Sequence, residues 1–139
     1  MREILPGVFH WTVDWPGVFP LESYWLKTDT GSILIDPIEG PDLGAIEESG
    51  DVLAVILTTG GHERSAGLFA RRTGATMYIP AVYERLIENP GEYATYEDGE
   101  TLPGRILAIA TPGQRMADGE HALLSPLHGG TLIVGDCLG

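Results

Sequence analysis

The sequence predicts an α/β protein in which helices cover mixed sheets of short strands. Residues 8–13 alternate between apolar and polar side chains, as strands with one buried face do. The central segment Val52–Thr58 is instead apolar on both faces, which is typical of a strand buried between layers. An amphipathic helical segment follows it directly, so strands and helices belong to one layered unit.

The N-terminal part is predicted to be an antiparallel meander that leads into a helix. Its expected strands are Val8–Val13, Ser23–Thr28 and Ser32–Asp36. Pro16-Gly17 and the turn Asp29-Thr30-Gly31 separate them. The acidic segment Pro41–Ser49 is expected to form a short helix that ends at Gly50.

The remaining elements follow the buried central strand in order. An amphipathic helix is expected over Glu63–Thr73, with Gly74 as its stop, and a further helix over Ala81–Glu88. Tyr93–Gly104 is interpreted as a polar loop. The other expected strands are Thr76–Ile79, Arg105–Ala110, His121–Leu127 and Thr131–Val134, the last two forming a hairpin. Residues 1–139 are predicted to form a single domain.

Composition excludes several classes of function. The 139 residues include 20 Asp plus Glu and 8 Lys plus Arg, which gives a net charge of -12. Nucleic acids and anionic membranes are therefore not expected partners, since both are bound through clustered basic residues. The longest apolar run, Val52–Leu57, has six residues, and a membrane span needs about 20. Without a visible signal segment, and with Cys137 as the sole cysteine, a cytoplasmic protein is expected.

Chemistry is expected where buried strands run into glycine-rich loops, because such loops bring polar groups together over a rigid base. Three segments fit this description. They are Thr58–Arg64, Thr111–Gln114 and Gly135–Asp136.

The order of these segments resembles the metallo-β-lactamase fold superfamily, whose members have a T-H-x-H-x-D-H-x-G-G motif, then T-P-G-H and G-D motifs. Residues 56–69 align with the first motif and its helix without a gap, and Ser32–Pro37 and Thr131–Asp136 resemble two strands of the family. The resemblance implies an αββα sandwich of mixed sheets, incomplete at the C-terminus. It places a pocket at Thr59, Gly61, His62, Glu63, Arg64, Gln114 and Asp136.

The resemblance also implies that the metal site of the family is mostly lost. The ligand positions of the family fall, in order, on Thr59, Gly61, Glu63, Arg64, Gln114 and Asp136. Only Asp136 keeps the residue of the family, as the bridging carboxylate. Neither glycine nor a guanidinium can donate to zinc. No cofactor is therefore expected, and Arg64 or Arg115 is expected to pair with Asp136 or Glu63 in place of a metal.

Two functions follow from this resemblance. The first is a divergent, metal-free member that binds a small-molecule ligand or serves in assembly. The alternative is a hydrolase of small esters, thioesters or lactones that binds one Zn, Fe or Mn weakly through His62, Glu63 and Asp136. Fold analogy by itself favours a hydrolase only by association.

Other notable residues have simpler structural interpretations. Asp36 is expected to end a strand before Pro37 rather than to act in a site. Trp11 and Trp25 are explained by core packing, whereas an aromatic loop from Trp15 to Pro20 could wall a pocket. Cys137 is expected to be a buried small group rather than a nucleophile. Surface or strand-edge positions are expected for His10, His121 and His128.

The length of the chain is short for the family it resembles. Domains of the family continue beyond the G-D element, whereas this sequence has three residues after Asp136. A truncated domain is therefore expected, and a homodimer would cover the sheet edge and the apolar face that truncation leaves.

Overall fold

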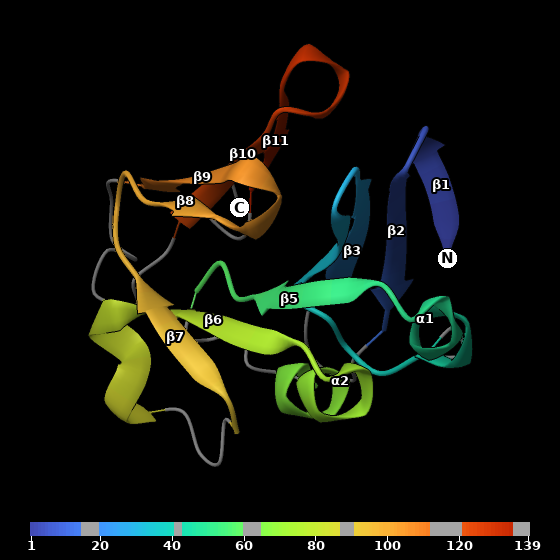
Figure 1. Cartoon of the computed structure of the whole chain (residues 1–139), viewed down its shortest axis with the longest axis horizontal. Coiled ribbons are helices and arrows are strands. Elements are labelled where there is room, and N and C mark those ends of the chain that lie inside the picture. The colour runs from blue at the N-terminus through green and yellow to red at the C-terminus, as the bar shows by residue number, and fades with distance from the viewer. Residues whose placement is uncertain (15–19, 41–42, 60–64, 87–90, 112–120, 135–139) are drawn as a thin grey trace.

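A computed structural model describes residues 1–14, 20–40, 43–59, 65–86, 91–111 and 121–134 (Figure 1). Its strands form one seven-stranded and one four-stranded sheet. The strands of the larger sheet are β1 (Arg2–Leu5), β2 (Val8–Val13), β3 (Leu21–Thr28), β4 (Gly31–Ile35), β5 (Val52–Ile56), β6 (Thr76–Pro80) and β7 (Tyr93–Tyr96). Those of the smaller sheet are β8 (Thr101–Leu102), β9 (Ile106–Ala110), β10 (His121–Ser125) and β11 (Thr131–Ile133).

The larger sheet combines an antiparallel half with a parallel half. Its spatial order is β1-β2-β3-β4-β5-β6-β7. Strands β1 to β4 pair antiparallel, and β4 to β7 pair parallel. Because the strands of the parallel half run in one direction, their carboxyl ends meet at one edge of the sheet.

Helices cover one face of the larger sheet and the smaller sheet covers the other. Helices α1 (Leu43–Ser49) and α2 (Ala66–Thr73) lie on one side of β5 and β6 in Figure 1, and β8 to β11 lie on the other side. The described chain therefore has three layers: helices, a mixed sheet and an antiparallel sheet. None of its helices has the length and apolar character that crossing a membrane requires.

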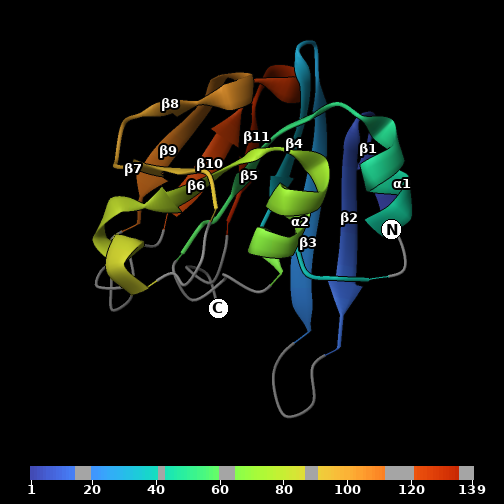
Figure 2. The ribbon, with the colours of Figure 1, turned by 60° about the horizontal axis from the view of Figure 1, so that its bottom comes forward.

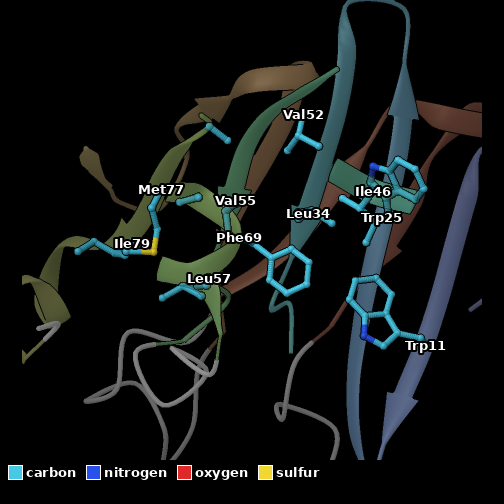
Figure 3. Close-up of a cluster of buried hydrophobic side chains, with 13 residues drawn as sticks. Trp11, Trp25, Leu34, Ile46, Val52, Val55, Leu57, Phe69, Met77 and Ile79 are labelled. Atoms are coloured by element: carbon cyan, nitrogen blue, oxygen red, sulfur yellow. The ribbon is translucent and has the colours of Figure 1, made fainter. Parts of the chain in front are cut away.

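Each interface between layers holds its own apolar core. Between the helices and the larger sheet, Phe69 of α2 packs among side chains that include Leu34, Val55 and Trp11 (Figure 3). Between the sheets, the buried residues include Leu26, Ile33, Ile56, Tyr96, Ile106 and Leu123. Alternation in β4 thus sends Leu34 to one core and Ile33 to the other, which is why this strand is apolar throughout.

The structure confirms most of the predicted elements. The strands β2 to β4 form the expected meander, and β10 pairs antiparallel with β11 as the expected hairpin. Helix α2 ends at Gly74, whose φ of 76° is left-handed and whose N–H donates to the Ala70 carbonyl. The predicted central strand is buried except at Leu53, which is 40% exposed and lies against the Gly31 turn.

Two predictions between residues 81 and 104 are wrong. Residues 81–86 form a 3-10 helix, η2 (Ala81–Leu86), instead of the first part of an α-helix. The predicted polar loop contains β7, β8 and the short turn η3 (Pro103–Arg105). Residues 93–96 pair with β6, which buries Tyr96 completely, and the charged residues of the predicted loop begin only at 97.

Candidate binding site at the carboxyl edge of the parallel strands

The parallel strands bring polar residues together at their carboxyl edge. Asp36 follows β4, Thr58 and Thr59 follow β5, and Tyr96 ends β7. In open α/β sheets, ligands bind outside the carboxyl ends of the strands. This edge is therefore the candidate site.

Asp36 connects the ends of β4 and β5. Its side chain is buried, and its carboxylate accepts hydrogen bonds from the Thr58 backbone N–H at 2.8 Å and from the Thr58 hydroxyl at 2.5 Å. Its backbone carbonyl accepts a bond from the buried Ser23 hydroxyl at 2.8 Å. Its φ of 48° lies in the left-handed region, which Asp tolerates better than most residues. The expectation that Asp36 has a structural role at the strand end is confirmed.

Tyr96 and His121 hold the same stretch of backbone from the other side. The Tyr96 hydroxyl donates to the Leu57 carbonyl, and the His121 backbone N–H donates to the Thr58 carbonyl at 2.7 Å. The two rings pack edge to face, with centroids 4.9 Å apart. Residues 57 and 58 are thus fixed from β4, β7 and β10 together.

The residue that follows the predicted motif loop is anchored as well. Ser65 donates its backbone N–H to the Pro37 carbonyl at 3.2 Å, and its hydroxyl accepts the Glu39 N–H at 2.9 Å. Both flanks of residues 60–64, at Thr58 and at Ser65, are therefore tied to the segment that begins at Asp36.

Only one of the predicted pocket residues lies in the described part of the chain. Thr59 is 4% exposed at the end of β5. The others, Gly61, His62, Glu63, Arg64, Gln114 and Asp136, lie outside the described residues. The same holds for Arg115, Cys137, Trp15 and Phe19.

The prediction for His121 is wrong, whereas those for two tryptophans are confirmed. His121 is 6% exposed instead of lying at the surface, because β10 begins beneath Tyr96 and beside Thr58. Trp11 and Trp25 belong to the core, with exposed fractions of 6% and 5%. Sequence reasoning missed Tyr96 and His121 as part of this edge. The apolar and β-branched residues of 93–96 were the available signal for a strand.

The residues present do not fit the dinuclear zinc site of the resembled family. Among the described residues no three His, Cys, Asp or Glu side chains form a cluster that could hold a metal ion. The Asp36 carboxylate already accepts two hydrogen bonds from Thr58, and the buried residue at the first histidine position of the motif is Thr59. Of the remaining ligand positions, glycine at 61 and arginine at 64 cannot donate to zinc at all.

A mixed sheet facing an antiparallel sheet, a helical layer and a polar edge at the strand ends define a metallo-β-lactamase fold. A Cronobacter sakazakii metallo-β-lactamase with a HARLDQ motif matches with a TM-score of 0.69 and 20% identity, over 94% of this chain and 61% of that chain. A putative metallo-β-lactamase from Thermotoga maritima matches with a TM-score of 0.61 and 18% identity, over 94% of this chain and 79% of that one.

Other solved structures with this fold give similar values. The FEZ-1 metallo-β-lactamase from Legionella gormanii has a TM-score of 0.61 and 18% identity, over 84% of this chain and 57% of that one. The chain thus spans 57% and 61% of the Legionella and Cronobacter proteins. No protein-family model and no curated protein sequence matches the chain.

Tyr96 gives the folded protein a predicted dependence on alkaline pH. Burial raises the pKa of the Tyr96 hydroxyl well above its usual value, and the charge of Asp36 raises it further. The folded protein therefore keeps this proton at pH values where the unfolded chain has lost it. Its contribution to stability is complete below about pH 10 and decreases above it, by up to about 1.4 kcal/mol per pH unit.

Urea unfolding between neutral pH and alkaline pH measures this effect. Tyr96→Phe should lower the free energy of unfolding at neutral pH by about 1 kcal/mol and decrease the alkaline loss. Tyr93→Phe, at an exposed tyrosine of the same strand, is the matched control and should leave both unchanged. If the native protein and Tyr96→Phe lost the same free energy of unfolding between neutral and alkaline pH, Tyr96 would not be the group responsible.

Proposed function

We propose that the chain binds a small-molecule ligand at the carboxyl edge of β4 to β7, without a zinc-activated water. The observation that carries the proposal is the buried Thr59 at the position of the first histidine ligand, beside a Thr58 that two hydrogen bonds hold to Asp36. The scaffold that presents the motif loop is intact, while most donor positions of the motif have changed. A retained scaffold with altered donors favours binding over metal-assisted hydrolysis.

The anchored backbone supports a binding role on physical grounds. A ligand site needs fixed first contacts, because ordering a loose loop costs free energy on binding. Here Asp36, Tyr96 and His121 fix residues 57 and 58 before any ligand arrives. Loops that leave such a base can bring together side chains from distant parts of the sequence.

The competing function is a metal-dependent hydrolase of small esters, thioesters or lactones. It would rely on His62, Glu63 and Asp136 as ligands of one weakly bound Zn, Fe or Mn. His62 and Glu63 are consecutive at a predicted helix start, where neighbouring side chains point about 100° apart, so both facing one metal is strained. Arg64 would add a positive charge beside the cation, which opposes metal binding.

Elemental analysis of protein purified without chelator distinguishes the two functions. The proposal predicts less than about 0.1 Zn, Fe or Mn per chain, because the donor set is too poor for tight binding. Metal near one per chain that is lost in Asp136→Asn, but kept in the control Asp98→Asn, would overturn the proposal and support the hydrolase. The homodimer expected from the sequence stays a prediction.

A further inference from the structure

A cavity lies away from the carboxyl edge. Its volume is about 340 Å³, which is at the small end of the range for ligand pockets. It lies between the β3–β4 turn, the turn η3 and the 3-10 turn η5 (Leu127–Gly129). The residues that line it are Thr28, Asp29, Thr30, Gly104, Arg105, Pro126 and Leu127.

This cavity is distinct from the candidate site described above. It adjoins the first residue of β4, whereas Asp36 follows the last residue of that strand. Arg105 likewise precedes β9, whose far end pairs with His121. The β3–β4 turn lies at the top of Figure 2, at one end of the long strands. The two sites therefore occupy opposite ends of the sandwich.

The cavity wall carries one charge of each sign. Asp29, with a carboxylate, and Arg105, with a guanidinium, are both exposed residues that line the cavity. In the described part of the chain these two side chains form no salt bridge, with each other or with another residue, in contrast to Lys27 with Asp51 and Arg72 with Glu47. Both charges are consequently available to a ligand that enters between them.

The backbone that carries Arg105 is closely packed, while the side chain itself is exposed. Gly104 packs so closely that a Cβ atom there would lie 3.3 Å from both Ile33 and Thr28 side-chain atoms. Arg105 itself has a φ of 58°, a left-handed conformation that is costly for a residue other than glycine. The wall that carries the guanidinium is thus packed against β3 and β4. Pro126 and Leu127 add an apolar surface to the same cavity.

We propose that this cavity binds a small zwitterion of the α-amino acid class. The carboxylate of the ligand would accept two hydrogen bonds from the Arg105 guanidinium, whose planar geometry suits a carboxylate. Its ammonium group would pair with Asp29, and an aliphatic side chain would contact Pro126 and Leu127. A ligand with both charges neutralises both wall groups, whereas a simple anion or amine leaves one of them unpaired.

NMR titration of the protein with glycine, L-alanine and L-leucine tests whether the cavity binds an amino acid. Two analogues of leucine, each lacking one of its charges, are titrated beside them: 3-methylbutylamine has no carboxylate and 4-methylpentanoate has no amine. We expect at least one amino acid to bind with a Kd in about the millimolar range. Both analogues should bind at least about fivefold more weakly, because each loses one charge-assisted contact.

Variants of the native full chain locate the binding. Arg105→Gln and Asp29→Asn should each weaken amino-acid binding at least about fivefold by removing one charged partner. Arg85→Gln and Glu97→Gln, exposed charges outside the cavity, should leave it unchanged. Failure of all three amino acids to bind, equal binding of a singly charged analogue, or binding that survives both cavity variants would overturn the proposal. Thermal unfolding of each variant is measured as well. A transition at the same temperature as that of the native chain excludes misfolding as the cause of lost binding.

Discussion

Asp36→Ala is expected to lower the free energy of unfolding by about 2–4 kcal/mol, because it removes two buried hydrogen bonds to a carboxylate. Their donors are the backbone N–H and the hydroxyl of Thr58, both bound to the Asp36 carboxylate in the native chain. Alanine also tolerates the left-handed φ of 48° at this position poorly. Urea denaturation of the native and variant chains measures the loss.

Two further variants identify the cause. Asp36→Asn keeps an acceptor oxygen for the Thr58 N–H, and its amide NH2 can donate to the Thr58 hydroxyl oxygen in place of the bond that the carboxylate accepts. It should therefore cost about 1 kcal/mol, the difference between charged and neutral hydrogen bonds. Asp98→Ala is the control, because Asp98 also accepts a backbone N–H, from Ala110 at 2.8 Å, but is exposed. A loss for Asp36→Ala no greater than that for Asp98→Ala would contradict a clamp at Thr58.

Phe69→Ala is expected to cost about 3–5 kcal/mol, as buried Phe-to-Ala changes do when the core cannot collapse into the space. Phe69 is fully buried and connects α2 to the larger sheet, with its ring 6.4 Å from that of Trp11 (Figure 3). Strands on the opposite side of Phe69 are fixed in a sheet, so most of the cavity should remain. Helix α2 would lose its main contact with the layer beneath.

Thermal and urea unfolding measure the stability lost in Phe69→Ala, where a buried side chain is truncated, and in Val82→Ala, where an exposed one is. Val82 is 60% exposed, and its removal should change stability by less than about 0.5 kcal/mol. Phe69→Leu retains most of the apolar volume and should recover more than half of the loss. If Phe69→Ala and Val82→Ala proved equally stable, α2 would not be held by this core.

The order of the elements could be predicted from the sequence because it follows from local rules. Alternation in 8–13, the two-sided apolar run at 52–57 and the glycine at 74 each act within a few residues. The spacing of the strand-end motifs was enough to indicate the fold, which the structural neighbours confirm. The same alignment showed that zinc donors are missing, because the sequence has threonine and glycine at positions where the family has histidine.

The carboxyl edge required the tertiary structure. Asp36 and Thr58 are 22 residues apart, and Tyr96 and Leu57 are 39 apart, so no local pattern brings them together. Residues 93–96 were included in a predicted polar loop that contains Asp98-Gly99, yet their pairing with β6 buries Tyr96. His121 was expected at the surface because it has no metal-ligand spacing to another histidine, yet it is buried at the start of β10.

The sequence by itself determined most of the strands and helices outside residues 81–104, the net acidic charge of the chain and the zinc donors that its motif positions lack. Only the tertiary structure decided which buried polar groups meet at the ends of β4, β5 and β7, and that Asp29 and Arg105 share a cavity at the opposite end. The physical reason is how far along the chain each kind of interaction acts. Periodicity and turn chemistry act between neighbours along the chain, whereas burial and hydrogen bonding of these groups depend on how distant strands pair and which face each presents.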